Sequence, residues 1–551
     1  MTRRSKAPLK LPGWAALAAA CLGQFMSVLD GTIVNVALPA VRRSLDLGPV
    51  ELQWVINAYL LTFGGLLLLG GRLGDHFGRK RIYLLGAVLF SLASCIGGLA
   101  PTGATLIAAR AIQGIGAALL APGTLSLIAT AYPEARARGR ALGIWSATAG
   151  SAASAGVLLG GVLTDTLGWR WVFFVNIPIG LLVLALGGAA LVESRGSDDE
   201  SAHLDVPGAL LITAAMTLLV YAVVDTDRYA WGSLHTLVPL EASILLLLAF
   251  IVFEAHSEAP LMPLGILRRP TVGAGVLAVS LFGVMLTGSY YFLSLYLQGP
   301  RGLSPLEAGL AFLPNTGLSI VSAAVAPRLC VRFGPRATLV AGLSLAALSM
   351  LWLSQVTAHG SLVATLLVPS SVFGIATGLC FVCVTVLVTA GVERSHTGLA
   401  SGMINAGRQI GGSVGLAALA VVAASRTRAL LASHSASPAQ ALAAGYGRAF
   451  LICAAVGAVA IVIVLLRASP REAALTETYA VTPALAAAGA VDGSPVLARP
   501  PESPVAVAVA AEARPPVIAF GAQERSLRGA VVGAVVGAVA LVLVLVRRRR
   551  E

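Results

Sequence analysis

The chain has 551 residues, of which 57% are hydrophobic and only 11% are charged. Soluble globular proteins average roughly 45 to 50% apolar and 25% charged residues, so the composition excludes an ordinary soluble protein. The net charge of +13 would suggest nucleic-acid binding in a soluble chain. In a membrane protein, cationic loops on one side of the bilayer produce the same excess, and we expect no nucleic-acid partner.

Long apolar runs recur along most of the chain. A run of about 18 or more apolar residues has the length of a membrane-spanning helix. Such runs predict an all-α polytopic membrane protein with a cytoplasmic N-terminus at residues 1–13. The fourteen predicted spans are residues 14–39, 52–71, 81–100, 104–130, 141–163, 171–192, 206–224, 237–255, 271–298, 305–327, 338–355, 361–390, 398–424 and 448–466.

The distribution of Lys and Arg between the loops predicts the orientation of these spans. If the N-terminus is inside, the inside segments carry 18 Lys and Arg and the outside segments carry 8. Cytoplasmic loops of membrane proteins carry the excess of positive charge. We therefore expect a multi-pass protein of the cell membrane with a cytoplasmic N-terminus.

An internal repeat indicates two halves. The pattern R-L-x-x-x-F-G-x-K at residues 72–80 recurs as R-L-x-x-x-F-G-x-R at residues 328–336, and both copies fall on the predicted cytoplasmic side. Two halves related by an axis along the membrane normal have this property. The predicted domains are two six-helix halves, at residues 14–192 and 271–466, with two inserted helices within residues 206–255.

The C-terminal part has a different composition. Residues 467–528 are rich in Pro, Ala and Glu and predict a flexible cytoplasmic linker, followed by an apolar segment with a basic end at residues 529–551. A fifteenth span here would place four arginines outside, against the charge rule, so a hairpin or a helix lying on the surface is the alternative. Three glycines in this segment have the spacing of closely packed helix pairs: Gly529, Gly533 and Gly537.

Three charged residues lie well inside predicted spans: Asp30, Arg110 and Arg408. A charge at the bilayer centre costs about 2.5 to 3.5 kcal/mol on insertion scales, so each is a functional candidate. Asp30 is followed by the polar Asn35 in the same span. A buried carboxyl can carry a proton, and the alternative role for Asp30 is that of a hydrogen-bond partner between helices.

The two arginines stand in similar glycine-containing segments. Arg110 begins R-A-I-Q-G with Gln113, and its fixed charge is suited to holding a carboxylate deprotonated. The alternative is that it satisfies backbone carbonyls at a helix break. Arg408, with Asn405 nearby, is expected to serve the second half in the same way. These residues are the predicted proton and substrate pathway.

The loop after the second predicted span has glycines and charges suited to a latch between conformations. We expect Asp75 to accept hydrogen bonds from backbone N–H groups near the helix ends or to pair with a cation of an adjoining loop such as Arg136 or Arg140. Arg79 and Lys80 are expected to anchor at the lipid surface. The predicted gating residues are Gly71, Asp75, Gly78, Arg79 and Lys80.

These motifs together resemble a known family. The loop resembles the major facilitator signature G-x-L-x-D-x-x-G-R-K, and the run at residue 110 resembles that family's R-x-x-Q-G. Residues 29–39 resemble the L-D-x-T-I-V-N-V-A-L-P of the fourteen-span drug:proton antiporters (EmrB/QacA type), as does the W-R-W-x-F-x-x-N-x-P run at residues 169–178. The resemblance covers about residues 14–466. It implies the major facilitator fold and export of drugs or metabolites by alternating access, driven by proton entry.

One motif departs from this pattern. The family's antiporter motif resembles G-x-x-x-G-P-x-x-G-G, and here Val157 stands where proline is expected, so a helix kink is expected to be lost. The glycines of this predicted antiporter helix are Gly150, Gly156, Gly160 and Gly161. Strong selectivity for divalent cations is not expected, because the second half has no acidic residue well inside its first two spans.

We therefore expect a proton-coupled exporter of lipophilic or monocationic small molecules. The partners expected are the substrate, protons and the lipid bilayer. No metal site or cofactor is predicted, because the six cysteines fall in or beside apolar runs, and no phosphate-loop or nucleophile spacing indicates an enzyme. The alternatives are a dedicated exporter of one endogenous metabolite and, from another class, a channel or receptor with a partner-binding tail.

Overall fold

The structure is a computed structural model of the chain. It describes residues 13–132, 134–194, 205–226, 228–230, 232–257, 260–262, 264–390, 392 and 397–468. The predictions for residues 1–12, for nearly all of the linker and for the apolar segment at residues 529–551, including its glycines, lie outside the described residues.

All regular secondary structure in the described part of the chain is helical. Fourteen of its segments are long and apolar enough to span a membrane, which confirms the fourteen predicted spans. The helices of the first half are α1 (Gly13–Leu45), α2 (Pro49–Phe77), α3 (Arg79–Leu99), α4 (Gly103–Ala131), α5 (Ala135–Thr166), α6 (Trp171–Phe174) and α7 (Asn176–Ala190). The remaining helices are α8 (Val206–Asp225), α9 (Leu234–His256), α10 (Leu264–Leu267), α11 (Pro270–Gln298), α12 (Pro305–Phe333), α13 (Pro335–Leu353), the π-helix η1 (Val363–Leu367), α14 (Val368–Ala390), α15 (Thr397–Ala432) and α16 (Pro438–Arg467).

The helices start and stop at residues whose chemistry satisfies the free backbone groups. Ser304 begins α12 with a capping box, in which Glu307 donates its N–H to the serine hydroxyl and its carboxylate accepts from the serine N–H. Gly78, between α2 and α3, and Gly334, between α12 and α13, have φ of 111° and 82°. Both belong to the repeated motif, and a positive φ favours glycine because it has no Cβ.

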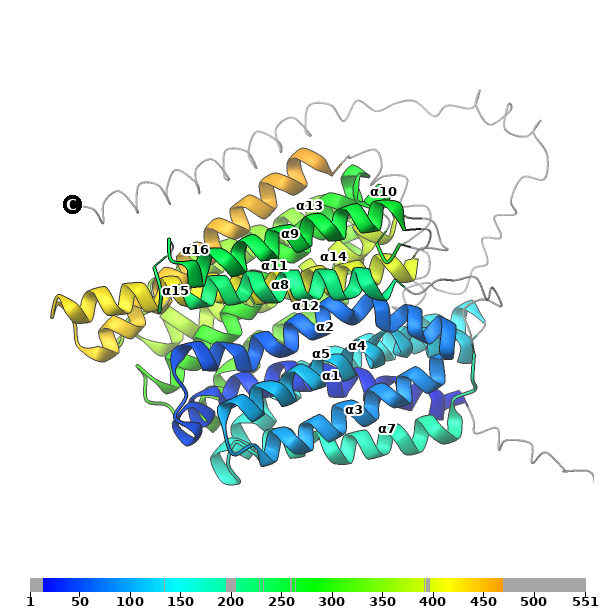
Figure 1. Cartoon of the computed structure of the whole chain (residues 1–551), viewed down its shortest axis with the longest axis horizontal. Coiled ribbons are helices and arrows are strands. Elements are labelled where there is room, and N and C mark those ends of the chain that lie inside the picture. The colour runs from blue at the N-terminus through cyan, green and yellow to red at the C-terminus, as the bar shows by residue number, and fades with distance from the viewer. Residues whose placement is uncertain are drawn as a thin grey trace, which may run out of the picture. The chain divides into compact units, whose positions relative to one another are not determined.

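The helices of each half pack mainly on one another. In Figure 1 the blue and cyan helices α1 to α7 lie side by side in the lower part of the bundle, and α13 and α16 lie in the upper part. The largest contacts between halves join α2 to α15 and α5 to α12, and α8 contacts both α2 and α15. The inserted pair α8 and α9 therefore lies against the seam between the halves.

Hydrogen bonds cross the seam between α1 and α11. The Ser294 hydroxyl donates to the Asn35 carbonyl at 2.6 Å, and the Gln298 side chain donates to the Val36 carbonyl at 2.8 Å. Ser294 and Gln298 belong to the last turns of α11. These bonds close the seam at the bundle end where α1 finishes and α2 begins.

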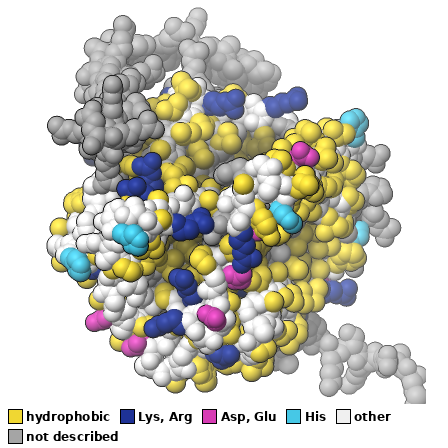
Figure 2. All heavy atoms as spheres, turned by 60° about the vertical axis from the view of Figure 1, so that its left-hand side comes forward, with side chains coloured by type: hydrophobic (Ala, Val, Ile, Leu, Met, Phe, Trp, Pro, Cys, Tyr) yellow, Lys and Arg dark blue, Asp and Glu magenta, His cyan; other side chains and the backbone are white. Residues whose placement is uncertain are grey.

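The surface has the polarity of a membrane protein. Figure 2 views the bundle from the left-hand side of Figure 1 and shows Lys, Arg, Asp and Glu side chains gathered on one end, beside a largely hydrophobic flank. Many large apolar side chains of α9 are exposed, including Leu245, Leu248 and Val252. An apolar flank between polar ends is what a bilayer requires of a spanning bundle.

Candidate functional site

Asp30 lies in the middle of α1 with its side chain fully buried. Its carboxylate forms an ion pair with Arg110 of α4, in which Arg110 Nη1 is 2.5 Å from Asp30 Oδ2. The two side chains are 0% and 1% exposed. A charge buried to this degree is stable only when it is both paired and hydrogen-bonded.

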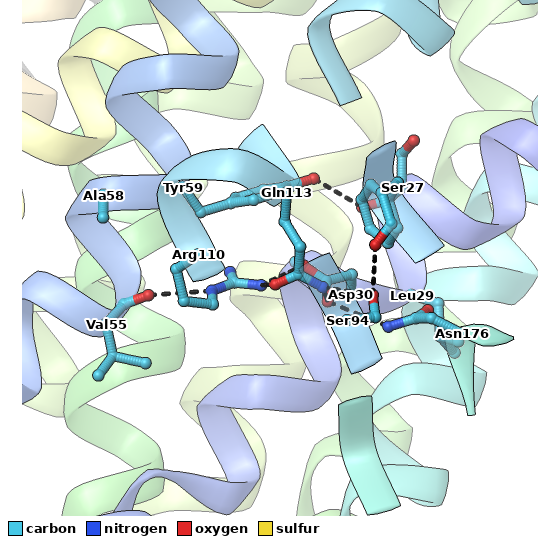
Figure 3. Close-up of polar contacts among 12 residues, drawn as sticks. Ser27, Leu29, Asp30, Val55, Ala58, Tyr59, Ser94, Arg110, Gln113 and Asn176 are labelled. Carbon is cyan, nitrogen blue, oxygen red and sulfur yellow. Dashed lines mark hydrogen bonds and ion pairs between the residues drawn. The ribbon is translucent and has the colours of Figure 1, made fainter. Parts of the chain in front are cut away.

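Two amides complete the surroundings of the carboxylate. Gln113 of α4 and Asn176, the first residue of α7, donate to Asp30 Oδ1 at 3.2 and 3.3 Å. Gln113 Nε2 also donates to the Ser94 hydroxyl of α3 at 2.7 Å. In Figure 3 the side chains of Arg110, Gln113 and Asn176 point toward Asp30. Four helices of the first half, α1, α3, α4 and α7, therefore meet in one buried polar network.

Arg110 has further partners on α2. Its Nε donates to the Val55 carbonyl at 3.0 Å, and its Cζ lies 4.3 Å from the centre of the Tyr59 ring. The Tyr59 hydroxyl donates to the Ser27 carbonyl of α1 at 3.3 Å. Arg110 therefore binds both a backbone carbonyl of α2 and the carboxylate of Asp30.

The glycine after Gln113 permits this arrangement. A Cβ on Gly114 would lie 2.6 Å from the Tyr59 carbonyl and 2.0 Å from the Thr62 hydroxyl. Any larger residue would separate α4 from α2. The R-x-x-Q-G run therefore supplies the charge, the amide and the close helix contact that bring Arg110 against Tyr59.

The other predicted pathway residues lie away from this network. The Asn35 side chain donates to the Gly31 carbonyl one turn earlier in α1, at 2.9 Å. Asn405 of α15 is exposed and donates to the Ser401 carbonyl of its own helix at 3.1 Å. Among the described residues, the side chain of neither asparagine contacts Asp30 or the two arginines.

Arg408 of α15 differs sharply from Arg110. Its guanidinium Cζ lies 5.5 Å from the centre of the Phe381 ring of α14. No hydrogen bond or ion pair to another described residue involves the guanidinium, and its Nε is buried without a partner. The expectation that Arg408 serves the second half as Arg110 serves the first therefore has no matching carboxylate among the described residues.

Three members of the Asp30 network were missed by the sequence analysis as site residues: Tyr59, Ser94 and Asn176. Asn176 stands in the W-R-W-x-F-x-x-N-x-P run, so its motif was a usable signal. Ser94 and Tyr59 carry no comparable signal, because serine and tyrosine inside a span are common. Only tertiary packing places Ser94 beside Gln113 and Tyr59 beside Arg110.

In the gating loop, Asp75 pairs with Arg79 at 2.8 Å across the Gly78 turn. The turn at Gly78 brings the start of α3 within reach of Asp75, so this contact is more local than the expected pair with Arg136 or Arg140. The side chain of Arg136 lies outside the described part of the chain, and a pair with the adjoining loop stays a prediction.

The basic residues of this loop bind protein groups. Lys80 Nζ donates to the Gly188 carbonyl of α7 at 2.7 Å, and its backbone N–H donates to Glu193 at 3.1 Å. A Cβ on Gly78 would lie 2.5 Å from the same Glu193 carboxylate. Gly71, near the end of α2, faces Pro122 of α4 at 3.6 Å. The loop therefore ties α2 and α3 to the end of α7.

The antiporter-helix glycines line two helix contacts of α5. A Cβ on Gly156 would lie 2.8 Å from the carbonyl of Leu29, the residue before Asp30 in α1. A Cβ on Gly160 would lie 2.8 Å from the carbonyl of Ile33, one turn further along α1. Gly161 and Gly150 face Pro305 and Ile320 of α12. Val157, in place of proline, is fully buried, and α5 is helical from Ala135 to Thr166. These glycines set how closely α5 approaches α1 and α12.

A cavity of about 420 Å³ opens between α2, α4 and α8. None of the predicted site residues lines it. Its lining is apolar apart from two threonines and consists of Trp54, Ala58, Leu61, Thr62, Ala104, Ile107, Ala108, Ala111 and Thr217.

Comparison with known proteins identifies relatives along most of the chain. The chain is 42% identical over 414 residues to the cephamycin export protein of Amycolatopsis lactamdurans, covering 75% of this chain and 85% of the relative. It is 40% identical over 421 residues to the puromycin resistance protein of Streptomyces alboniger, covering 76% and 83%. A multidrug resistance protein of Mycobacterium tuberculosis is 36% identical over 415 residues, covering 75% and 76%.

Solved structures share the fold at low identity. A peptide transporter of the POT family in an autoinhibited form has a TM-score of 0.61 at 13% identity, covering 81% of this chain and 96% of that one. A bacterial homologue of the human lysosomal transporter Spinster has a TM-score of 0.55 at 17% identity, covering 86% and 98%. The sequence profile of the Major Facilitator Superfamily matches residues 20–416. The chain belongs to the Major Facilitator Superfamily, and with its fourteen candidate spans it is a multi-pass membrane protein of the drug-exporter type.

Proposed function

We propose that this protein is a proton-coupled exporter of lipophilic small molecules such as antibiotics. The observation that carries the proposal is the Asp30–Arg110 pair, which is fully buried and enclosed by amides on α4 and α7. The relatives named for antibiotic export and resistance support the export of drugs.

The proposed proton step uses the charge balance of this pair. Protonation of Asp30 removes its negative charge, whereas the Arg110 guanidinium does not deprotonate in proteins. Arg110 then has an uncompensated buried charge and must find a new partner or reach water. Because Asp30 is on α1 and Arg110 on α4, loss of the pair favours a shift of α4 against α1. Such a shift links proton uptake to the opening of one side of the bundle.

The substrate is proposed to lie between the halves, where α15 faces α2. The sequence expectation included monocations. Asp30 is the one carboxylate at the centre of a described span, and in this conformation it is committed to Arg110, so the structure offers a cation no free counter-charge there. We therefore propose lipophilic molecules as the broader substrate class.

The orientation proposed is N-terminus inside, which the 18 to 8 distribution of loop cations supports. Protons then enter from outside as substrate leaves. A tag after Glu551 and a tag before Met1, probed with a membrane-impermeant reagent on intact cells, test this orientation.

The test of function uses the full chain in proteoliposomes with an imposed pH gradient. We expect cephamycin to accumulate in vesicles that are acidic inside, and we expect its addition to speed the collapse of the gradient. Substrate accumulation that is the same with and without the pH gradient would refute proton coupling. Transport of a single compound from a broad panel would instead favour a dedicated exporter.

A further inference from the structure

Arg408 is a partly buried cation without a counter-charge among the described residues of its own half. Between residues 270 and 467 the sequence has two acidic residues, Glu307 and Glu393. Glu307 is used in the capping box at the start of α12, and Glu393 lies outside the described residues. The described helices around Arg408 therefore offer it no free acidic side chain.

Asp30 of the first half is not free to pair with Arg408, because its carboxylate accepts hydrogen bonds from Arg110, Gln113 and Asn176. The Arg408 guanidinium keeps its charge at any physiological pH. Its Nε is buried without a partner, and a desolvated polar group without a partner is costly. Arg408 is therefore a position where an anion that arrives from outside the chain would be stabilised.

Arg408 belongs to the helix of the second half that packs on α2 of the first half. A Cβ on Gly64 of α2 would lie 2.8 Å from the Cβ of Gln409, the next residue of α15. The Arg408 backbone packs on α11, since a Cβ on Gly283 would collide with the Arg408 carbonyl. The guanidinium itself lies over the Phe381 ring of α14. Arg408 is therefore on a helix of the seam between the halves.

The neighbouring side chains are aromatic. Phe381 makes an edge contact with Phe282 of α11 at 5.9 Å, and Phe282 stacks on Phe373 of α14 at 6.1 Å. A cation beside such rings suits a ligand that carries both an acidic group and an aromatic or apolar body. The acidic group forms the charge-assisted hydrogen bonds, and the rings bind the body.

We propose that Arg408 binds the anionic group of the exported molecule, so that the preferred substrates are amphipathic organic acids. The proposal rests on the proposed export function and narrows its substrate class. The packing of α15 on α2 gives it a route to the proton site, because the Tyr59 ring of α2 lies 4.3 Å from the Arg110 guanidinium. An anion on Arg408 changes the electrostatic field at Tyr59 and Arg110, and so reaches the pair formed by Arg110 and Asp30.

The test compares two dyes that share one aromatic framework. Anilinonaphthalene sulfonate carries a negative charge, and N-phenyl-1-naphthylamine is the same framework without it. Equilibrium binding to the purified full chain in detergent, followed by fluorescence, needs no gradient and so tests recognition apart from transport. We expect the wild type to bind the sulfonate more tightly than the neutral dye, and Arg408→Gln to weaken sulfonate binding at least tenfold while binding of the neutral dye changes less than twofold.

The matched control is Arg426→Gln, an exposed arginine on the same helix, which should leave both dyes unaffected. Arg408→Lys keeps the positive charge and should retain part of the preference for the sulfonate, which covers the case in which Arg408→Gln does not fold. Equal loss of both dyes in folded Arg408→Gln, or a wild type that does not prefer the sulfonate, would overturn the proposal. If sulfonate binding depends on Arg408 but the protein shows no proton-driven transport, anion recognition by Arg408 is supported and the proposed export function is refuted.

Discussion

Asp30 and Arg110 place opposite charges at the centre of the first half with almost no exposure to solvent. Removing one partner from a buried pair costs roughly 3 to 5 kcal/mol, because the other charge stays buried without compensation. Removing both charges costs much less. The stability of this pair therefore depends on keeping the charges balanced.

Charge balance predicts how substitutions combine. Arg110→Met should destabilise the protein by about 3 to 5 kcal/mol, because the Asp30 carboxylate loses its cation. Adding Asp30→Asn should restore most of that stability, since the neutral amide still accepts from Gln113 and Asn176. Thermal unfolding of the purified variants in detergent measures both effects. A double variant as unstable as Arg110→Met would show that packing, and not charge, sets the cost.

Tyr59 offers a second prediction at the scale of one residue. Its ring contacts the Arg110 guanidinium, whereas its hydroxyl makes a single bond to the Ser27 carbonyl at 3.3 Å. Tyr59→Phe keeps the ring and should retain proton-driven efflux within about threefold, because one neutral hydrogen bond contributes roughly 0.5 to 1.5 kcal/mol. Tyr59→Leu removes the ring and should reduce efflux at least tenfold. Equal efflux from both variants would exclude a role for the ring.

Helix contacts depend on glycines at chosen positions of α5. The Cβ of an alanine at residue 156 would lie 2.0 Å from the Thr32 hydroxyl and 2.8 Å from the Leu29 carbonyl. Gly143 of the same helix has nothing within 4 Å of its Cβ position. The two glycines therefore form a matched pair that differs only in helix contact.

We expect Gly156→Ala to cost about 1 to 3 kcal/mol by overpacking and to reduce efflux, because α1 and Asp30 must move away from α5. Gly143→Ala should leave efflux unchanged and stabilise the protein by roughly 0.5 to 1 kcal/mol. Folded yield, thermal unfolding and efflux from cells measure both variants. Normal efflux and stability in Gly156→Ala would mean that α1 and α5 separate without effect on the site.

The apolar runs predicted where helices span the membrane better than where they end. The second span was expected to end at residue 71, whereas α2 continues to Phe77. The polar residues beyond Gly71 remain helical, and Asp75 among them pairs with Arg79 at the start of α3. Helix α16 begins at Pro438, ten residues before the expected start of its span at residue 448, because Ser437 and Gln440 form a capping box there. Polar helix ends carry no apolar signal.

The candidate site was less accessible to sequence reasoning than the fold. Asp30, Arg110 and Gln113 stood out because charge and amides are costly inside a span. Ser94 and Tyr59 did not, because the contacts of Ser94 with Gln113 and of Tyr59 with Arg110 arise only when α3 and α2 pack on α4. That Arg408 has no carboxylate partner among the described residues could be recognised only once the partners of Asp30 were known.

At the scale of the whole molecule, alternating access requires the two halves to separate at one end at a time. The bonds from Ser294 to the Asn35 carbonyl and from Gln298 to the Val36 carbonyl join the halves at one end. These bonds must break in every transport cycle if the bundle opens there.

A cross-link at this position tests that requirement. Asn35→Cys with Ser294→Cys, in a chain whose six native cysteines are replaced by serine or alanine, should be joined by a short bifunctional thiol reagent. We expect transport to stop on cross-linking and to recover after reduction. Each single-cysteine variant treated with the same reagent is the control. Full transport in completely cross-linked protein would show that this end stays closed throughout.

The central claim is that Asp30 carries the transported proton. The most direct measurement compares wild type, Asp30→Asn and the exposed control Asp165→Asn in proteoliposomes, recording accumulation driven by a pH gradient and substrate exchange without a gradient. We predict that Asp30→Asn loses gradient-driven accumulation and substrate-induced proton release but retains exchange, while Asp165→Asn matches the wild type. Accumulation by folded Asp30→Asn at the wild-type level would contradict the account.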